Sequence, residues 1–231
     1  QILGPASGDG RGVCNVTLAP ELPGSPALVE ELVRCGVRVS MGHSLAGADE
    51  ARAATRAGAA GVTHLYNAMR PAHHRSPGVI EAALTRDDIA IGLIADGVHV
   101  HPASVDVALR CKPPDRVILV SDIVSAAGAE GRTTLDGRDV EVRGGAAWLS
   151  ESGTLSGASA FLLEGVCNLV AWFDLPLPRA FQTASANPAR LLGIARRKGS
   201  LEVGKDADVI VLDRDLRLKA TVVEGAVAYK A

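Results

Sequence analysis

Short apolar runs alternate repeatedly with amphipathic stretches along this sequence. Residues 12–21 (GVCNVTLAPE) predict a buried strand, and residues 25–36 (SPALVEELVRCG) predict a helix with Ser25 as its N-cap and a closing glycine. The same plan recurs over 37–58, 61–86 and 89–111, and 116–122 (RVILVSD) supplies a fifth strand. Strands joined by helical crossovers pair in parallel, so this half of the chain predicts an α/β fold around a parallel sheet.

Side chains able to take part in catalysis or metal binding follow the predicted strands at one end. His43, His64, His99 and Asp122 each fall at or just beyond the carboxyl end of a successive strand. Parallel α/β sheets and barrels build their sites at this edge, because the carboxyl ends of all the strands meet there. Their position, more than their residue type, makes these four side chains candidates for chemistry.

The pattern changes after Asp122. Residues 133–149 alternate with a period of two around Asp136-Gly137, which is a hairpin signal, and two helical stretches follow before a segment of short strands and turns. We therefore expect one domain over residues 1–195, with a β-hairpin insertion near 131–150, and a small β layer over residues 196–231.

Composition excludes several classes of partner. A formal charge of −2 without a long basic block argues against nucleic-acid binding, and no apolar run approaches the roughly 20 residues of a membrane span. The cysteines are far apart in apolar contexts and predict buried thiols in a reducing, cytoplasmic setting. The chain begins with Gln1 in a loop-like stretch unlike a signal peptide, so we expect the sequence to start in mid-protein.

His43 and His64 are the best candidates for metal ligands. They end neighbouring predicted strands, so their imidazoles can converge on one divalent metal. Asp122 is then either a further ligand or the base that takes a proton from water whose pKa the metal lowers. The alternatives are buried structural histidines and, for Asp122, a cap of a helix or turn.

Three other features have competing interpretations. His73 and His74 lie past their strand beside Arg70 and Arg75, which favours a solvated or anion-contacting loop. The sequence "GHSLAG" is similar to a nucleophile elbow with Ser44 as nucleophile, but its last glycine is replaced by Ala46 and no histidine follows residue 101. The small-residue stretch 154–159 predicts a loop that either presents N–H groups to an anion or caps the next helix.

The motifs together resemble a known family. "VTLAPE", "GHS", "THLYNAM", "HHRSPG", "IADGVHV", "LVSD", "GTLSGA", "NPARLLG" and "GSLEVGKDADVIVLD", in this order, are similar to N-acetylglucosamine-6-phosphate deacetylases of the amidohydrolase superfamily. The resemblance runs from about residue 13 to the end. It implies about strands four to eight of an eight-stranded β/α barrel, with residues 196–231 as part of a β-sandwich.

The resemblance also implies roles for individual residues. His43 and His64 would bind a divalent metal, Zn²⁺ or Fe²⁺, and Asp122 would be the catalytic acid and base in hydrolysis of the acetamide of N-acetylglucosamine 6-phosphate. The substrate-binding residues would be Asn67, Ala68, Arg75, His99, Leu155, Ser156, Gly157 and Ala158. A homodimer that shares the phosphate site is also implied, and the guanidinium of Arg75 suits bidentate phosphate binding.

The sequence departs from that family at several points. The family's first metal-binding glutamate, in an upstream "HxEGP" motif, and its first three barrel strands have no counterpart here. Ile123 is bulkier than the usual residue beside the proposed base. Five strands cannot close an eight-stranded barrel, so we expect an open edge, a tendency to aggregate and weak or absent activity of this chain alone.

Two further functions fit the same residues. Another amidohydrolase with a different amide substrate would share the metal ligands but not Asn67 and Arg75. A noncatalytic sugar-phosphate-binding remnant or assembly partner would bind ligand without releasing acetate.

Overall fold

A five-stranded parallel sheet forms the centre of the molecule in the computed structural model, which describes residues 12–231. Its strands are β1 (Asn15–Leu18), β2 (Arg38–Met41), β3 (Gly61–Val62), β4 (Ala90–Leu93) and β5 (Val117–Leu119). They are paired in sequence order, and each neighbouring pair is parallel. The predicted α/β fold is confirmed.

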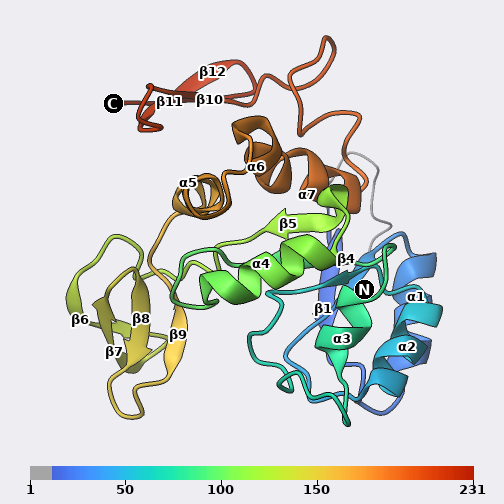
Figure 1. The fold of residues 1–231 in the computed structure, drawn as a ribbon. Coiled ribbons are helices and arrows are strands. Elements are labelled where there is room, and N and C mark those ends of the chain that lie inside the picture. The colour runs from blue at the N-terminus through green and yellow to red at the C-terminus, as the bar shows by residue number, and fades with distance from the viewer. Residues whose placement is uncertain (1–11) are drawn as a thin grey trace.

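Helices connect these strands, as the alternation predicts. They are α1 (Ser25–Arg34), α2 (Ala48–Arg56), α3 (Val79–Leu84) and α4 (Pro102–Cys111), with a short 3₁₀ turn, η1 (Pro114–Arg116), before β5. Figure 1 shows α1, α2 and α3 side by side next to the sheet. The prediction of Ser25 as N-cap is wrong: Gly24 is the cap, with φ of 79°, and Ser25 is the first, buried residue of the helix.

The core lies between the sheet and these helices. All four residues of β4 are buried, and Val29 and Leu32 of α1 pack into the same cluster as Val39 and Met41 of β2. Each fully buried aliphatic side chain of this kind contributes about 1.5–3 kcal/mol. This packing fixes the strand ends from which the candidate site is built.

A second, antiparallel sheet follows Asp122. It consists of β6 (Gly131–Leu135), β7 (Arg138–Arg143), β8 (Ala146–Leu149) and β9 (Leu155–Ala158). Asp136 and Gly137 both have positive φ, 49° and 76°, as a two-residue hairpin turn requires. The prediction of a loop at 154–159 is wrong for residues 155–158, which form β9, because this stretch pairs with β8.

The chain then returns to the parallel sheet. Helices α5 (Leu162–Phe173), α6 (Leu177–Ala184) and α7 (Ala186–Leu191) contact β5. An antiparallel sheet of β10 (Val209–Leu212), β11 (Leu218–Val223) and β12 (Ala226–Lys230) ends the chain and lies over α5 and α6 in Figure 1. None of the helices in residues 12–231 has the length and apolar character needed to cross a membrane.

Candidate active site

Two histidines meet at the carboxyl edge of the parallel sheet. His43 lies two residues beyond β2 and His64 two residues beyond β3, and their Nε2 atoms are 2.9 Å apart. The rings meet edge to face, with centroids 4.7 Å apart. His64 is buried, with 5% of its surface exposed, whereas His43 is exposed. The structure thus brings together the two residues predicted as metal ligands.

The backbone at this edge is unusual. His43, His64, Ala68 and Asp122 all have φ between 33° and 54°, in the left-handed region that residues other than glycine rarely adopt. Such conformations cost about 1–3 kcal/mol each and persist where the surrounding structure holds them. Their concentration at the strand ends supports a functional role for this edge.

The histidine pair fits two positions of a metal site. Two imidazole nitrogens bound to one tetrahedral Zn²⁺, at about 2.0–2.1 Å each, lie about 3.3 Å apart. The observed 2.9 Å between the Nε2 atoms of His43 and His64 is close to this spacing, so a small opening of the pair accommodates a cation. Among residues 12–231, however, no group of three or more His, Cys, Asp or Glu side chains is placed to hold a metal.

Asp122 and His99 face each other at the same edge. The Oδ2 atom of Asp122 lies 3.7 Å from Nε2 of His99, and the Asp122 side chain is 45% exposed. On its other side the His99 ring contacts Asp96, whose Oδ2 is 2.6 Å from Nδ1. Asp122 is therefore open to a ligand, while His99 is held between two carboxylates.

The β9 strand runs beside Asp122. The N–H of Ala158 donates to the carbonyl of Asp122 at 2.9 Å, and the N–H of Val124 donates to the carbonyl of Ala158 at 3.0 Å. Gly157 has φ of 129°, and a Cβ there would lie 2.3 Å from Cγ1 of Val124. Residues Leu155, Ser156, Gly157 and Ala158 thus lie along the Asp122 segment, with Ile123 40% exposed next to it.

The segment after His64 folds back on itself. The side-chain amide of Asn67 donates to the carbonyls of His64 and Leu65, at 3.3 and 3.2 Å. The carbonyl of the exposed Ala68 accepts from the N–H of Ser44 at 2.9 Å. Asn67 and Ala68 therefore lie within one short turn of the histidine pair.

Ser44 connects three loops and is not placed as a nucleophile. It is buried, its hydroxyl donates to Glu21 at 2.6 Å, and its carbonyl accepts from the N–H of Arg70 at 3.1 Å. Glu21 also accepts from the N–H of Leu45 at 2.7 Å. Burial alone raises the pKa of Glu21, but these hydrogen bonds and the Arg70 guanidinium hold it below its ordinary value. The hydroxyl of Ser44 is thus bound to a carboxylate instead of to a histidine base.

His73, His74 and Arg75 lie in an exposed loop beyond the site. The two histidine rings stack with centroids 4.9 Å apart, and Nη1 of Arg75 is 2.8 Å from Nε2 of His74. Glu81 accepts from the N–H groups of His73 and Gly78 and so fixes the two ends of the loop. The loop presents positive charge to solvent, in keeping with the interpretation of His73 and His74 as loop residues.

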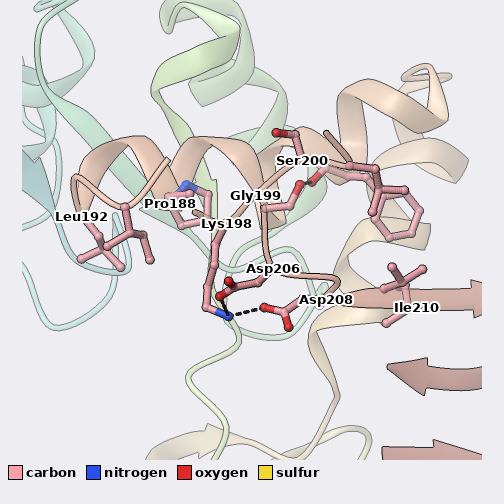
Figure 2. A pocket seen from close by; sticks show the side chains of 14 residues that line it. Pro188, Leu192, Lys198, Gly199, Ser200, Asp206, Asp208 and Ile210 are labelled. Carbon is pink, nitrogen blue, oxygen red and sulfur yellow. Dashed lines mark hydrogen bonds and ion pairs between the residues drawn. The ribbon is translucent and has the colours of Figure 1, made fainter. Parts of the chain in front are cut away.

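A cavity of about 460 Å³ lies elsewhere, between α7 and β10 (Figure 2). Aliphatic side chains such as Leu192 and Ile210 form much of its lining, and its one lysine, Lys198, is paired with Asp206 and Asp208. None of the site residues predicted from the sequence lines this cavity. The groups suited to hydrolysis lie at the carboxyl edge of the parallel sheet, where His43 and His64 meet, and not in this cavity.

Two residues that sequence reasoning did not assign to the site support it. Glu21 joins the loops after β1 and β2, and Asp96 accepts three hydrogen bonds, all from its own loop. The sequence signal for both is a carboxylate at or near the carboxyl end of a predicted strand.

The fold and the strand-end site define a class of protein. The chain matches the amidohydrolase family over residues 9–228 and belongs to that family.

Two curated relatives of this sequence are named as deacetylases of amino-sugar phosphates. The chain is 42% identical over 226 residues to N-acetylglucosamine-6-phosphate deacetylase of Rattus norvegicus, covering 95% of this chain and 55% of the relative. It is 40% identical to N-acetylgalactosamine-6-phosphate deacetylase of Escherichia coli O157:H7, covering 92% of this chain and 56% of the relative. The chain thus spans about half the length of the curated relatives it matches.

Solved structures agree with this relationship. N-acetylglucosamine-6-phosphate deacetylase from Thermotoga maritima matches with a TM-score of 0.88 and 33% identity, covering 95% of this chain and 60% of that one. A variant of the Mycobacterium smegmatis enzyme, solved in complex with N-acetyl-D-glucosamine-6-phosphate, matches with a TM-score of 0.88 and 37% identity. The match covers 94% of this chain and 57% of the Mycobacterium smegmatis chain. The chain is therefore a partial homologue of these deacetylases.

Proposed function

We propose that this chain carries the metal-binding and acid–base part of a deacetylase that hydrolyses the acetamide of N-acetylglucosamine 6-phosphate. The observation that carries the proposal is the 2.9 Å contact between Nε2 of His43 and Nε2 of His64 at the strand edge that also holds Asp122. Relatives that share 40–42% identity over most of this chain are named for this reaction or for its galactosamine counterpart.

His43 and His64 would hold a divalent cation, Zn²⁺ or Fe²⁺. Members of the amidohydrolase family are generally metal-dependent, and neutral imidazole suits both ions. When bound, the cation supplies polarisation of the acetamide carbonyl and lowers the pKa of water at the site.

Asp122 is the proposed acid and base. Its carboxylate is exposed at the site edge, and its backbone is held by the β9 strand through the hydrogen bond from the N–H of Ala158 to the backbone carbonyl of Asp122. It accepts a proton from the attacking water and then gives that proton to the departing amine nitrogen, which leaves glucosamine 6-phosphate and acetate.

The remaining residues bind the sugar phosphate. Asn67 and Ala68 contact the sugar from the turn after His64, and Leu155, Ser156, Gly157 and Ala158 line the pocket beside Asp122. Arg75 and His99 contact the sugar phosphate, and Arg75 acts across the interface of a homodimer. We place the protein in the cytoplasm. The exposure of Arg75 supports its place at an interface. The four unpaired cysteines among residues 12–231 support a cytoplasmic setting.

Acetate release tests the proposal directly. The protein as its gene encodes it is incubated with N-acetylglucosamine 6-phosphate and Zn²⁺, with N-acetylgalactosamine 6-phosphate and N-acetylglucosamine as comparison substrates. We expect release from the glucosamine phosphate, little from the sugar without phosphate, and a loss of at least about 100-fold in Asp122→Asn. Equal rates with and without the phosphate would contradict the substrate assignment, and an unchanged rate in Asp122→Asn would contradict the mechanism.

A further inference from the structure

We propose that Asp96 is a positioning residue that fixes the His99 ring with its proton on Nδ1, so that Nε2 is left as a hydrogen-bond acceptor for a hydroxyl of the ligand. The hydrogen-bond pattern of Asp96 carries this assignment. The use made of Nε2, acceptance of a hydrogen bond from a sugar hydroxyl, rests on the proposed function.

The Asp96 carboxylate is fully engaged within its own loop. Oδ1 accepts the N–H groups of Val98 and His99 at 2.9 and 2.8 Å, and Oδ2 lies 2.6 Å from Nδ1 of His99. The side chain is only 7% exposed, and that of His99 only 1%. Since neither oxygen can move without losing a partner, the ring is held in one orientation.

Helix α5 holds this loop from behind. The side-chain amide of Asn168 donates to the carbonyl of Ala95 at 2.8 Å. Gly97 has φ of 78°, and a Cβ at that position would lie 3.4 Å from the Trp172 ring. The loop that carries Asp96 and His99 is therefore fixed by α5 as well as by its own hydrogen bonds.

The ionised carboxylate decides where the proton lies. Burial by itself raises the pKa of Asp96, but the hydrogen bonds from His99 and Val98 outweigh burial and lower it, so the group is an acceptor at neutral pH. A carboxylate at 2.6 Å requires the N–H form of Nδ1. The Nε2 atom is then left on the side of Asp122, 3.7 Å away, and has no hydrogen-bond partner among residues 12–231.

The same geometry predicts the effect of one substitution. In Asp96→Asn the amide oxygen must stay at the Oδ1 position, because only an acceptor can satisfy the N–H groups of Val98 and His99. The amide NH₂ then faces Nδ1 of His99 and turns it into an acceptor. A neutral ring therefore carries its proton on Nε2, which inverts the tautomer with little change in shape.

Nitrogen-15 NMR of the imidazole reads the tautomer without any need for turnover. In the wild-type protein at mildly alkaline pH, we expect Nδ1 of His99 to show the shift of a protonated nitrogen. In Asp96→Asn we expect that signal on Nε2. A wild-type His99 with its proton on Nε2 overturns the proposal even if the variant does not fold, and so does an Asp96→Asn spectrum with the wild-type tautomer.

Two control variants separate positioning from general damage. Asp106→Asn removes a carboxylate that pairs with Arg110 on α4 and should leave the His99 tautomer unchanged. Asn168→Ala removes the support from α5 and should broaden the His99 signals without inverting the tautomer. Inversion in Asp106→Asn would show that the tautomer does not depend on Asp96.

Binding of glucosamine 6-phosphate connects the tautomer to the site. In Asp96→Asn the protonated Nε2 can no longer accept a hydrogen bond from the ligand hydroxyl, so we expect the affinity for this ligand to fall by about 10-fold. Unchanged affinity with an inverted tautomer would overturn the positioning role. If the wild-type protein does not bind the sugar phosphate at all, the proposed function fails, while the tautomer spectra still decide the role of Asp96.

Discussion

At the scale of single residues, the site depends on side chains held in conformations that the chain does not adopt freely. His43, His64 and Asp122 each follow a strand of the parallel sheet and each has a left-handed backbone. The turn that this conformation makes at His43 and at His64 lets the two imidazoles meet instead of pointing away along their strands. A metal site that uses these histidines should therefore be sensitive to each of them separately.

Metal binding provides the first prediction. We expect His43→Ala and His64→Ala each to lower Zn²⁺ affinity at least about 10-fold, since each removes one of two converging ligands. His74→Ala, in the exposed loop, should have no such effect. Competition with a chromogenic chelator measures the three affinities, and a loss only in His74→Ala would place the metal in the loop.

The pH dependence of stability in the acid range provides the second prediction. The folded-state pKa of Asp96 is lowered, so its contribution to stability is present above the ordinary carboxyl pKa of about 4 and is lost as pH falls through the folded value. Asp96→Asn should therefore be less stable than wild type at pH 6 and should lose less stability between pH 5 and pH 3. Urea unfolding midpoints of wild type and Asp96→Asn across this pH range measure the difference. Parallel dependence of the two midpoints on pH would show that Asp96 does not contribute.

Sequence reasoning reached some of these residues and not others. The positions of His43, His64 and Asp122 follow from strand periodicity alone, because the carboxyl ends of parallel strands share an edge. The parts played by Glu21 and Asp96 do not, because both act through hydrogen bonds to backbone N–H groups of nearby loops, and loop geometry leaves no periodic signal.

At the scale of elements, the loops after β1, β2 and β3 are tied together by Ser44. Its hydroxyl donates to Glu21 after β1, its N–H to Ala68 after β3, and its carbonyl accepts from Arg70. This arrangement explains why a serine follows the histidine at the end of β2, and it gives the sequence "GHS" a structural role.

Ser44→Ala tests this tie. The substitution leaves a partly buried carboxylate oxygen of Glu21 and the N–H of Ala46 without their partner, which should cost about 1.5–3 kcal/mol in urea unfolding. Ser76→Ala, at an exposed serine, should change stability by no more than about 0.5 kcal/mol. Complete loss of chelator-insensitive hydrolysis in Ser44→Ala, with unchanged stability, would instead support a nucleophilic serine.

The elements also show where periodicity misleads. Residues 12–21 were expected as one strand, but β1 covers only Asn15–Leu18, because the residues after it turn to bring Glu21 to Ser44. The small-residue stretch 154–159 lacks the bulky side chains typical of strands, yet residues 155–158 pair with β8 and lie beside Asp122. Tertiary pairing here outweighs local propensity.

At the scale of the whole molecule, apolar surface remains uncovered on the last sheet. Val227 and Tyr229 of β12 are 66% and 50% exposed. At the other end of the molecule, β1 pairs only with β2 among the described strands. Exposed apolar faces and open strand edges promote association.

Self-association should therefore depend on the apolar side chains of this strand. We expect the double variant Val227→Lys/Tyr229→Lys to shift the 231-residue chain toward monomer in sedimentation equilibrium, because charge opposes burial of the strand. The control Ala226→Lys/Ala228→Lys adds the same charges to the same strand without removing a large apolar side chain and should have a smaller effect. Equal shifts in the two variants would indicate a general charge effect.

We propose that the ends of two neighbouring parallel strands bring His43 and His64 onto one metal ion. An anomalous difference map of Zn²⁺-loaded crystals, recorded at the zinc absorption edge, decides this. We predict one strong peak within bonding distance of Nε2 of both histidines, about 2.0–2.1 Å from each. A peak at the His73 and His74 loop, or none at the strand edge, would contradict it.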